Sequence, residues 1–306
     1  MSKGKDKAQK IMKRIHVHNE DDGGIFTFTT GSMGSGKTAV MLSFLDYTLL
    51  HHPKDKVFVS EGYNTPIQVF KSKVVRSNLS KICFWFQNGG SFQLRDRQKH
   101  FKDVTYKFPS CTFDGFKDLY ERAEPGIANV VFFGNRLYWM DYIKYVMKNS
   151  EKWNHFFIDE LSEVMPAFQS GELFKHIGKF ADVLADSRKN WVNIHANTQH
   201  AGRCDHRPRS ISMVNIFLPG AREMKKVRVW QKAIDNLDTD PVRGNQAYLE
   251  MSGDFGVTRF KDIYKPNREF KIDCDCNTYE GGREYIIPSF CKDNKIAVNG
   301  DEIPVL

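Results

Sequence analysis

Short apolar runs alternate along this chain with longer stretches in which apolar residues recur every three or four positions, as in buried strands and amphipathic helices respectively. In one helical stretch Val40, Phe44 and Leu49 share a face, whereas Asp46 falls off that face and is expected to meet solvent. This alternation predicts an α/β fold in which helices cover both faces of a mainly parallel sheet. We predict strands at residues 25–29, 56–60, 81–86, 129–133, 153–158, 192–196, 211–218 and 227–231, and helices at residues 38–50, 113–123, 137–147 and 173–184.

The first predicted strand leads into a glycine-rich turn, and the turn leads into a helix. The turn has the pattern G-x-x-x-x-G-K-[ST], which in this context is typical of a phosphate-binding P-loop. Its glycines let backbone N–H groups approach triphosphate oxygens, and the helix N-terminus adds a partial positive charge. We predict that the turn binds ATP, with Lys37 on the β- and γ-phosphates and Thr38 on Mg²⁺. The residues of this turn are Gly31, Ser32, Met33, Gly34, Ser35, Gly36, Lys37 and Thr38.

Two further predicted strands end in polar residues that suit ATP hydrolysis. The strand at residues 153–158 ends in Asp159 and Glu160. Asp159 would hold the water shell of Mg²⁺ opposite Thr38, and Glu160 would polarise the attacking water. Such an acidic strand end is common by chance, so its interpretation depends on the P-loop. The strand at residues 192–196 leads to Gln199, which either bonds the γ-phosphate or the attacking water, or belongs to a plain strand-end turn.

Composition and charge narrow the class of protein. The chain has 306 residues, 41% hydrophobic and 27% charged, as expected of an ordinary globular protein. Lys and Arg outnumber Asp and Glu by 45 to 37, and this net charge of +8 favours a polyanionic partner. No apolar stretch is long enough for a membrane span, and the basic N-terminus lacks the apolar region of a secretory signal. We therefore expect a cytoplasmic protein, in a host cell or associated with a virion if it is viral.

Six scattered cysteines favour reduced thiols over a disulfide framework. Cys204 and His206, together with Cys274 and Cys276, form a weak candidate for a metal site. The spacing of Cys274 and Cys276 is tighter than that of the usual zinc half-site, so unrelated thiols are the simpler interpretation.

The chain divides into three regions. Residues 1–20 form a basic arm, either a solvated tail or helix or a contact with nucleic acid. Residues 21–235 form the core, with an insertion around residues 63–112. The insertion interleaves basic and aromatic residues, which suits either a nucleic-acid surface or a strand pair with buried aromatics. Residues 236–306 form a β-rich C-terminal extension, which either completes the sheet or makes a small appendage.

The order of these motifs resembles the FtsK–HerA superfamily of ring-forming, DNA-pumping ATPases, and in particular its viral genome-packaging and Zot-like members. The resemblance is carried by residues 31–38, 156–160 and 184–218. It implies a P-loop NTPase fold of the RecA/ASCE-like kind, with strand order 5-1-4-3-2.

The family also places subunits in a ring, expected here to be a homohexamer, in which a neighbour supplies an arginine in trans. Arg188 and Arg203 are the candidates for that arginine, and the alternative for each is an ordinary surface residue. The polar residues Asn193 and His195 depart from the family pattern, because apolar residues are usual in that strand.

These features predict an ATP-hydrolysing translocase of duplex DNA, in viral genome packaging or in DNA transfer, with a capsid or portal-type protein as a further partner. Three alternatives remain open. The first is a Zot-like ATPase of virion assembly or export, although such proteins usually carry a membrane span. The second is a P-loop small-molecule kinase. The third is an oligomeric scaffold that binds ATP without turnover.

Overall fold

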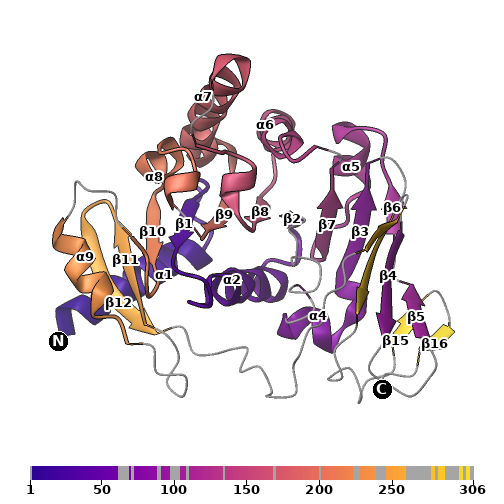
Figure 1. Cartoon of the computed structure of the whole chain (residues 1–306), viewed down its shortest axis with the longest axis horizontal. Helices are drawn as coiled ribbons and strands as arrows, with labels where there is room; N and C mark the ends of the chain where they lie inside the picture. The colour runs from indigo at the N-terminus through magenta and orange to yellow at the C-terminus, as the bar shows by residue number, and fades with distance from the viewer. Residues whose placement is uncertain are drawn as a thin grey trace.

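The computed structural model describes residues 2–60, 69, 72–87, 91–96, 104–107, 110–133, 135–167, 170–199, 201–222, 228–238, 246–259, 277–279, 282–286, 296–298 and 301–303. Its centre is a ten-stranded sheet in the order β12-β11-β10-β1-β9-β8-β2-β7-β3-β6 (Figure 1). Neighbouring strands from β10 to β6 are parallel, whereas β11 and β12 join in antiparallel fashion. The strands are β1 (Phe26–Thr30), β2 (Lys56–Ser60), β3 (Ile82–Phe86), β6 (Ser110–Thr112), β7 (Ala128–Phe132), β8 (Asn154–Ile158), β9 (Val192–Thr198), β10 (Val214–Phe217), β11 (Gln246–Met251) and β12 (Asp254–Arg259).

The central strands follow the order implied by the family resemblance. Numbering β1, β2, β8, β9 and β10 as strands 1 to 5 gives 5-1-4-3-2, because β10, β1, β9, β8 and β2 are consecutive neighbours. Strands β7, β3 and β6 extend the sheet beyond β2, so the segment between β2 and β8 adds three parallel strands to the core. The predicted α/β fold with a mainly parallel sheet is therefore confirmed.

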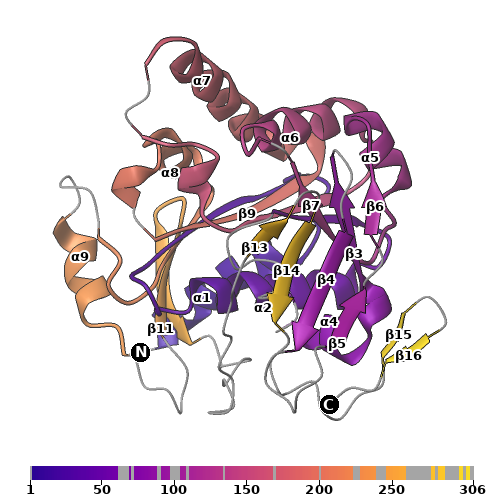
Figure 2. The ribbon, with the colours of Figure 1, turned by 45° about the vertical axis from the view of Figure 1, so that its right-hand side comes forward.

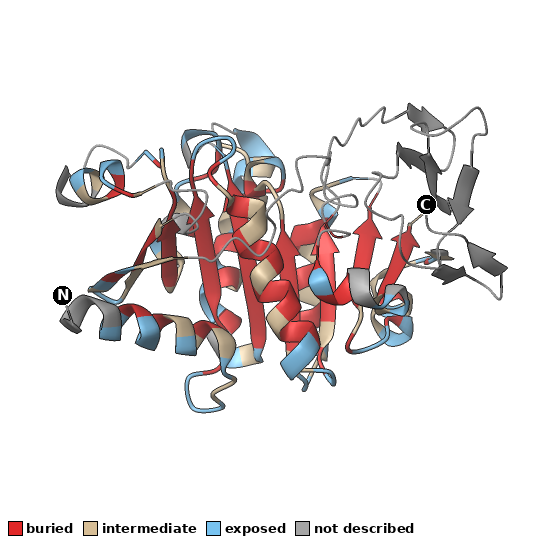
Figure 3. Cartoon of the chain, turned by 90° about the horizontal axis from the view of Figure 1, so that it is seen from below, coloured by how far each residue is buried: buried red, intermediate tan, exposed pale blue. Residues whose placement is uncertain are grey.

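Helices cover both faces of the sheet. One hydrophobic cluster packs α1, α2 and α4 on one face, and a second packs α5, α6 and α7 on the other (Figure 1). Buried residues accordingly follow the strands and the inner sides of the helices (Figure 3). Within the part of the chain that the structure describes, no helix combines the length and apolar character needed to cross a membrane. The helices are α1 (Ser2–His16), α2 (Lys37–His51), α4 (Lys73–Ser77), α5 (Phe116–Arg122), α6 (Tyr138–Asn149), α7 (Gly171–Ala185), α8 (Arg207–Ile211) and α9 (Arg228–Asp235).

Segments far apart in sequence form a second, smaller sheet in the order β13-β14-β4-β5 (Figure 2). Its strands β4 (Ser91–Asp96) and β5 (Val104–Lys107) come from the insertion, and β13 (Asn277–Tyr279) and β14 (Gly282–Ile286) from the C-terminal region. Strand β14 pairs in parallel with β4. The C-terminal region therefore contributes both to the main sheet, through β11 and β12, and to this second sheet. A last pair, β15 (Ile296–Val298) and β16 (Asp301–Ile303), is antiparallel.

The basic N-terminal segment is helical and packs on the core. Its residues Ala8, Ile11 and Ile15 are buried, and the Nζ atom of Lys7 lies 2.9 Å from Asp254 Oδ1 in β12. The apolar side of this helix faces the protein.

Most predicted helices and strands are confirmed within a few residues, but two predictions are wrong. Residues 227–231 were expected to be a strand, whereas Arg228–Asp235 is helix α9. Five residues of alternating character do not distinguish a strand from one turn of helix, and Ile234 of α9 packs against Tyr248 of the sheet. Asp46 was expected to face solvent, but it is buried. Its carboxylate accepts hydrogen bonds from the backbone N–H groups of Lys73 and Val74, at 3.1 and 3.3 Å, and so caps helix α4.

Candidate nucleotide-binding site

The predicted site residues meet where parallel strands end. Thr30 of β1 is paired with Thr198 of β9, and Ile158 of β8 is paired with Ala196 of β9. The residues that follow these strand ends therefore lie at one edge of the sheet. They include Gly31, Gln199, Asp159 and Glu160, which lie far apart in the sequence.

The P-loop has the backbone conformation that its glycines permit. Gly34 and Gly36 have φ angles of 75° and 96°, in the region that side chains disfavour. Gly36 is the N-cap of α2, which begins at Lys37. The ammonium group of Lys37 donates hydrogen bonds to the carbonyl oxygens of Gly31 (2.9 Å) and Ser32 (2.7 Å). Burial lowers the pKa of Lys37, and the nearby carboxylate charges of Glu160 and Asp159 act in the opposite direction.

The end of β10 holds the P-loop from outside. The backbone N–H and the hydroxyl of Ser32 both donate to the carbonyl oxygen of Pro219, at 3.2 and 3.1 Å. The next residue, Gly220, has a φ of 74°, and a Cβ there would lie 2.6 Å from Ser32 Oγ. The strand order and this loop decide the fold class. The fold is that of a P-loop NTPase.

The acidic pair lies beside this P-loop and is held by side chains of the neighbouring strands. Asn197 Nδ2 donates to Asp159 Oδ1 at 2.7 Å, and the backbone N–H of Asp159 donates to Ser60 Oγ at 3.0 Å. Thr198 Oγ1 donates to Glu160 Oε1 at 2.6 Å, and the backbone N–H of Gln199 donates to Glu160 Oε2 at 3.0 Å. A third donor to Glu160 is the hydroxyl of Ser162.

The backbone of Glu160 is itself unusual, with φ at 62°. Non-glycine residues rarely adopt the left-handed conformation, and those that do cluster at functional sites. The strained backbone and three hydrogen bonds fix the carboxylate in one place at the sheet edge. The side chain of Gln199 is exposed beside it.

Sequence reasoning placed Glu160 and Gln199 at the site but missed the residues that hold the acidic pair, namely Ser60, Ser162, Asn197 and Thr198. The sequence did contain a signal for Asn197 and Thr198, because they directly follow a predicted strand just as Asp159 and Glu160 do. Using that signal requires β8 and β9 to be recognised as parallel neighbours.

Three polar residues at alternate positions line one side of β9, and for two of them, Asn193 and His195, apolar residues were expected. The Oδ1 atom of Asn193 accepts from the backbone N–H of Ile25 at 2.9 Å. Nδ1 of His195 lies 2.9 Å from Thr27 Oγ1, and Asn197 bonds Asp159 as described above. All three of these β9 residues are buried. The departure from the family pattern therefore reflects a set of specific contacts from β9 to β1 and β8.

The two candidate arginines lie at opposite edges of the sheet. Arg203, in the short helical turn Ala201–Arg203 after β9, is exposed at the P-loop edge. Arg188 lies in the turn Asp186–Asn190 before β9, at the other edge, and its side chain is outside the described residues. The basic loop after β9 also contains Arg207, but that guanidinium is engaged with Asp205, with two contacts of 2.8 Å. These hydrogen bonds lower the pKa of Asp205 and raise that of Arg207.

Of the four residues considered as metal ligands, the structure describes only Cys204 and His206. Cys204 is buried, and that burial raises the pKa of its thiol. The side chain of His206, in contrast, is 70% exposed. Cys274 and Cys276 lie outside the described residues.

No known protein family and no curated protein sequence matches this chain. Among solved structures, it is similar to the genome packaging NTPase B204 from Sulfolobus turreted icosahedral virus 2 in complex with ATP-gammaS, with 11% identity and a TM-score of 0.48 over 79% of this chain and 98% of that one. The N-terminal domain of zonular occludens toxin from Neisseria meningitidis has 13% identity and a TM-score of 0.35, covering 79% and 97%. The pCW3 conjugation coupling protein TcpA, with ATPgS, has 13% identity and a TM-score of 0.42, covering 78% and 60%.

At such identities the similarity concerns the fold, so the chemistry of the site is interpreted from the residues of this chain alone.

Proposed function

We propose that this chain is an ATPase. The observation that supports the proposal is the position of Glu160 at the same sheet edge as the P-loop, with three hydrogen-bond donors to its carboxylate. A carboxylate so fixed can accept a proton from a water molecule that attacks the γ-phosphate. A P-loop alone would support only nucleotide binding.

The residues present suit ATP and Mg²⁺. A Cβ added at Gly34 would meet no atom within 4 Å, so the loop tip is open to a phosphate chain. Phosphate oxygens would compete with the Gly31 and Ser32 carbonyls for the ammonium of Lys37. The Thr38 hydroxyl and the Asp159 carboxylate are oxygen ligands of the kind that Mg²⁺ prefers. When bound, Mg²⁺ would neutralise charge on the β- and γ-phosphates.

We further propose that ATP hydrolysis drives movement of duplex DNA through a homo-oligomeric ring, expected to be a hexamer. The net charge of +8 suits a phosphate-backbone partner. Arg203 is exposed and follows Gln199 by four residues, at the P-loop edge of the sheet. A movement of the acidic pair would therefore be transmitted to Arg203 through this short segment. The family resemblance suggests viral genome packaging or DNA transfer as the setting.

The test is steady-state ATP hydrolysis with and without duplex DNA, on protein of measured oligomeric state. We expect Mg²⁺-dependent turnover that duplex DNA stimulates and that rising salt reduces, since binding to the DNA backbone releases counterions. Lys37→Ala should abolish turnover. If turnover is absent, or if Lys37→Ala leaves it unchanged, the ATPase proposal is wrong. Turnover without any response to DNA would refute translocation alone, and phosphate transfer to an acceptor other than water would indicate a kinase.

A mixing experiment tests whether Arg203 acts on a neighbour's site. We expect Arg203→Ala and Glu160→Gln to be inactive separately. A mixed oligomer should regain part of the activity, because an intact Glu160 can then face an intact Arg203 from the adjacent subunit. Absence of any recovery in a mixed oligomer of normal size would argue against Arg203 as the trans arginine.

A further inference from the structure

Histidines gather at the sheet edge opposite the P-loop, where no motif drew attention to them. Six of the ten histidines in the chain are linked there by ring contacts, directly or through Tyr47. The buried Asp55 carboxylate lies among them, just before β2. The histidines are His16, His18, His51, His52, His155 and His195.

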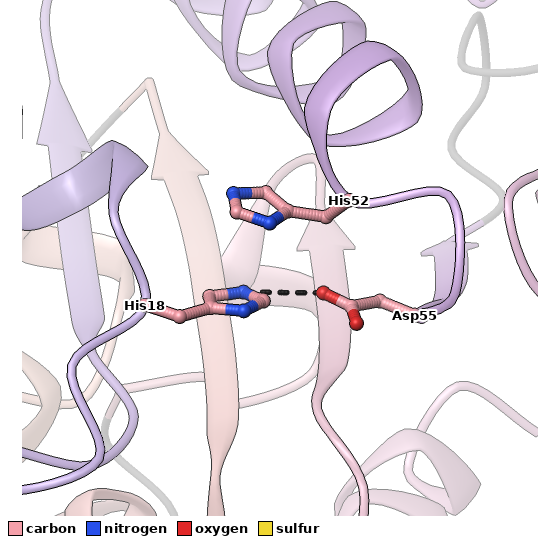
Figure 4. A group of neighbouring side chains, drawn as sticks. All are labelled: His18, His52 and Asp55. Atoms are coloured by element: carbon pink, nitrogen blue, oxygen red, sulfur yellow. Dashed lines mark ion pairs between the residues drawn. The ribbon is translucent and has the colours of Figure 1, made fainter.

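Three of these side chains offer donor atoms close enough to share one ion. His18, His52 and Asp55 each present one ligand atom, and the three atoms lie within 4.8 Å of one another (Figure 4). His18 Nε2 and Asp55 Oδ2 are 3.1 Å apart. A tetrahedral zinc ion with bonds of about 2.0–2.2 Å separates its ligand atoms by about 3.3 Å. The His18–Asp55 pair is thus already near that spacing, and His52 lies farther away.

The hydrogen bonds around the cluster decide which imidazole nitrogens carry lone pairs. His52 Nε2 lies 2.8 Å from the carbonyl oxygen of His16 and must donate to it, so its Nδ1 keeps a lone pair. Asn193 Oδ1 is occupied by the N–H of Ile25, which turns Nδ2 of Asn193 toward Nδ1 of His155 at 3.4 Å.

The proton of His155 therefore sits on Nε2 and is donated to Asp55 Oδ2 at 2.8 Å. His155 consequently orients the carboxylate from outside rather than binding an ion itself. Hydrogen-bonded partners of this kind are typical of ligating carboxylates.

We propose that His18, His52 and Asp55 bind one divalent transition-metal ion of the zinc type, with water completing the coordination. Two imidazoles and a carboxylate suit such ions better than they suit Mg²⁺ or Ca²⁺, which prefer all-oxygen sites. The His18 and Asp55 side chains are 20% and 12% exposed, so an ion can reach them from solvent. This site is separate from the nucleotide site and does not depend on ATPase activity.

Binding requires one rearrangement. The ring of His18 is stacked between His52, with centroids 3.9 Å apart, and Trp153, at 4.0 Å. Stacked rings do not direct their lone pairs to one point, so the His52 ring must rotate about its Cβ–Cγ bond to share an ion with His18. The bound ion would then join the segment after α1, the end of α2 and the start of β2.

The experiment uses the full chain without a histidine tag, dialysed against a chelator and then titrated with Zn²⁺ by calorimetry. We expect one Zn²⁺ per chain. Because the ion binds only the folded chain, we also expect the Tm of this 306-residue chain to rise by roughly 4 °C when free Zn²⁺ is about 100 times Kd. His18→Phe, which keeps the ring stack but has no nitrogen, should lose this binding and the Tm shift. His176→Ala removes a histidine of α7 outside the cluster and should retain both.

Asp55→Asn provides a second variant if His18→Phe is too unstable to titrate, as judged by circular dichroism without zinc. It should weaken Zn²⁺ binding at least tenfold. The proposal is overturned if the wild-type chain takes up no stoichiometric Zn²⁺, or if the variant that folds binds Zn²⁺ as tightly as His176→Ala does.

Discussion

Gly220 supports the P-loop from the end of β10, and its replacement by alanine tests that support. An alanine at φ 74° costs about 1–2 kcal/mol, because the left-handed region crowds Cβ. The added Cβ would also lie 2.6 Å from Oγ and 2.7 Å from Cβ of Ser32, so Ser32 must move. That movement would break its two hydrogen bonds to Pro219, worth about 0.5–1.5 kcal/mol each. Gly220→Ala should therefore lower the free energy of unfolding by about 2–5 kcal/mol.

Gly253→Ala is the matched control. Gly253 has a similar φ of 84°, but a Cβ there would meet nothing within 4 Å. Its free energy of unfolding, measured by urea denaturation, should fall only by the about 1–2 kcal/mol that an alanine in the left-handed region costs. Binding of a fluorescent ATP analogue should separate the two variants further. Since Ser32 supplies one of the two carbonyls that hold Lys37, Gly220→Ala should weaken binding about tenfold or more. Equal affinity in the two variants would refute the view that β10 positions the P-loop.

Three further perturbations test other parts of the structure. Glu160→Gln should reduce ATP turnover by about 10²–10⁴-fold without loss of ATP binding, because the proposed general base is removed; Glu163→Gln, three residues along, should stay close to wild type, and equal losses in the two variants would refute the proposed role of Glu160. Asp46→Ala should lower the free energy of unfolding by about 1–3 kcal/mol, since buried donors at the start of α4 lose their acceptor, whereas Asp182→Ala at an exposed position of α7 should change it by less than about 0.5 kcal/mol. Burial holds the pKa of His195 well below its ordinary 6.5, so the unfolded chain takes up a proton first, and stability should fall as pH drops through about 6.5, by at most about 1.4 kcal/mol per pH unit for this group. His195→Leu should make that fall shallower when unfolding is measured at several pH values in the presence of chelator, and an unchanged slope would contradict the assignment.

The sequence alone predicted those parts of the site whose residues lie in one continuous segment. The P-loop lies within one continuous segment, and its flanking strand and helix are set by the same few residues. The hydrogen bond from Thr198 to Glu160 joins residues 38 positions apart, and it depends on which strands are neighbours. That neighbour relationship came from the family resemblance and not from periodicity.

Asp46 illustrates a different limit. Helical spacing correctly placed it away from the main apolar face of α2, but spacing cannot show what packs on the remaining side. Helix α4 approaches there, and its free N–H groups need an acceptor, so a carboxylate is favoured in a buried position. The histidine cluster was hidden for a similar reason, because His18 and His155 come from segments more than a hundred residues apart.

The polar side of β9 limits how force can pass through the protein. Asn193 and His195 contact the β1 segment and Asn197 contacts the end of β8, so sliding β9 by two residues would mismatch the first two along β1 and the third along β8. The strand can consequently shift only together with β1 and β8, as one stiff unit. A pull on the loop after β9 would therefore act on the P-loop and on the acidic pair at the same moment, as the proposed coupling of DNA movement to ATP hydrolysis would require.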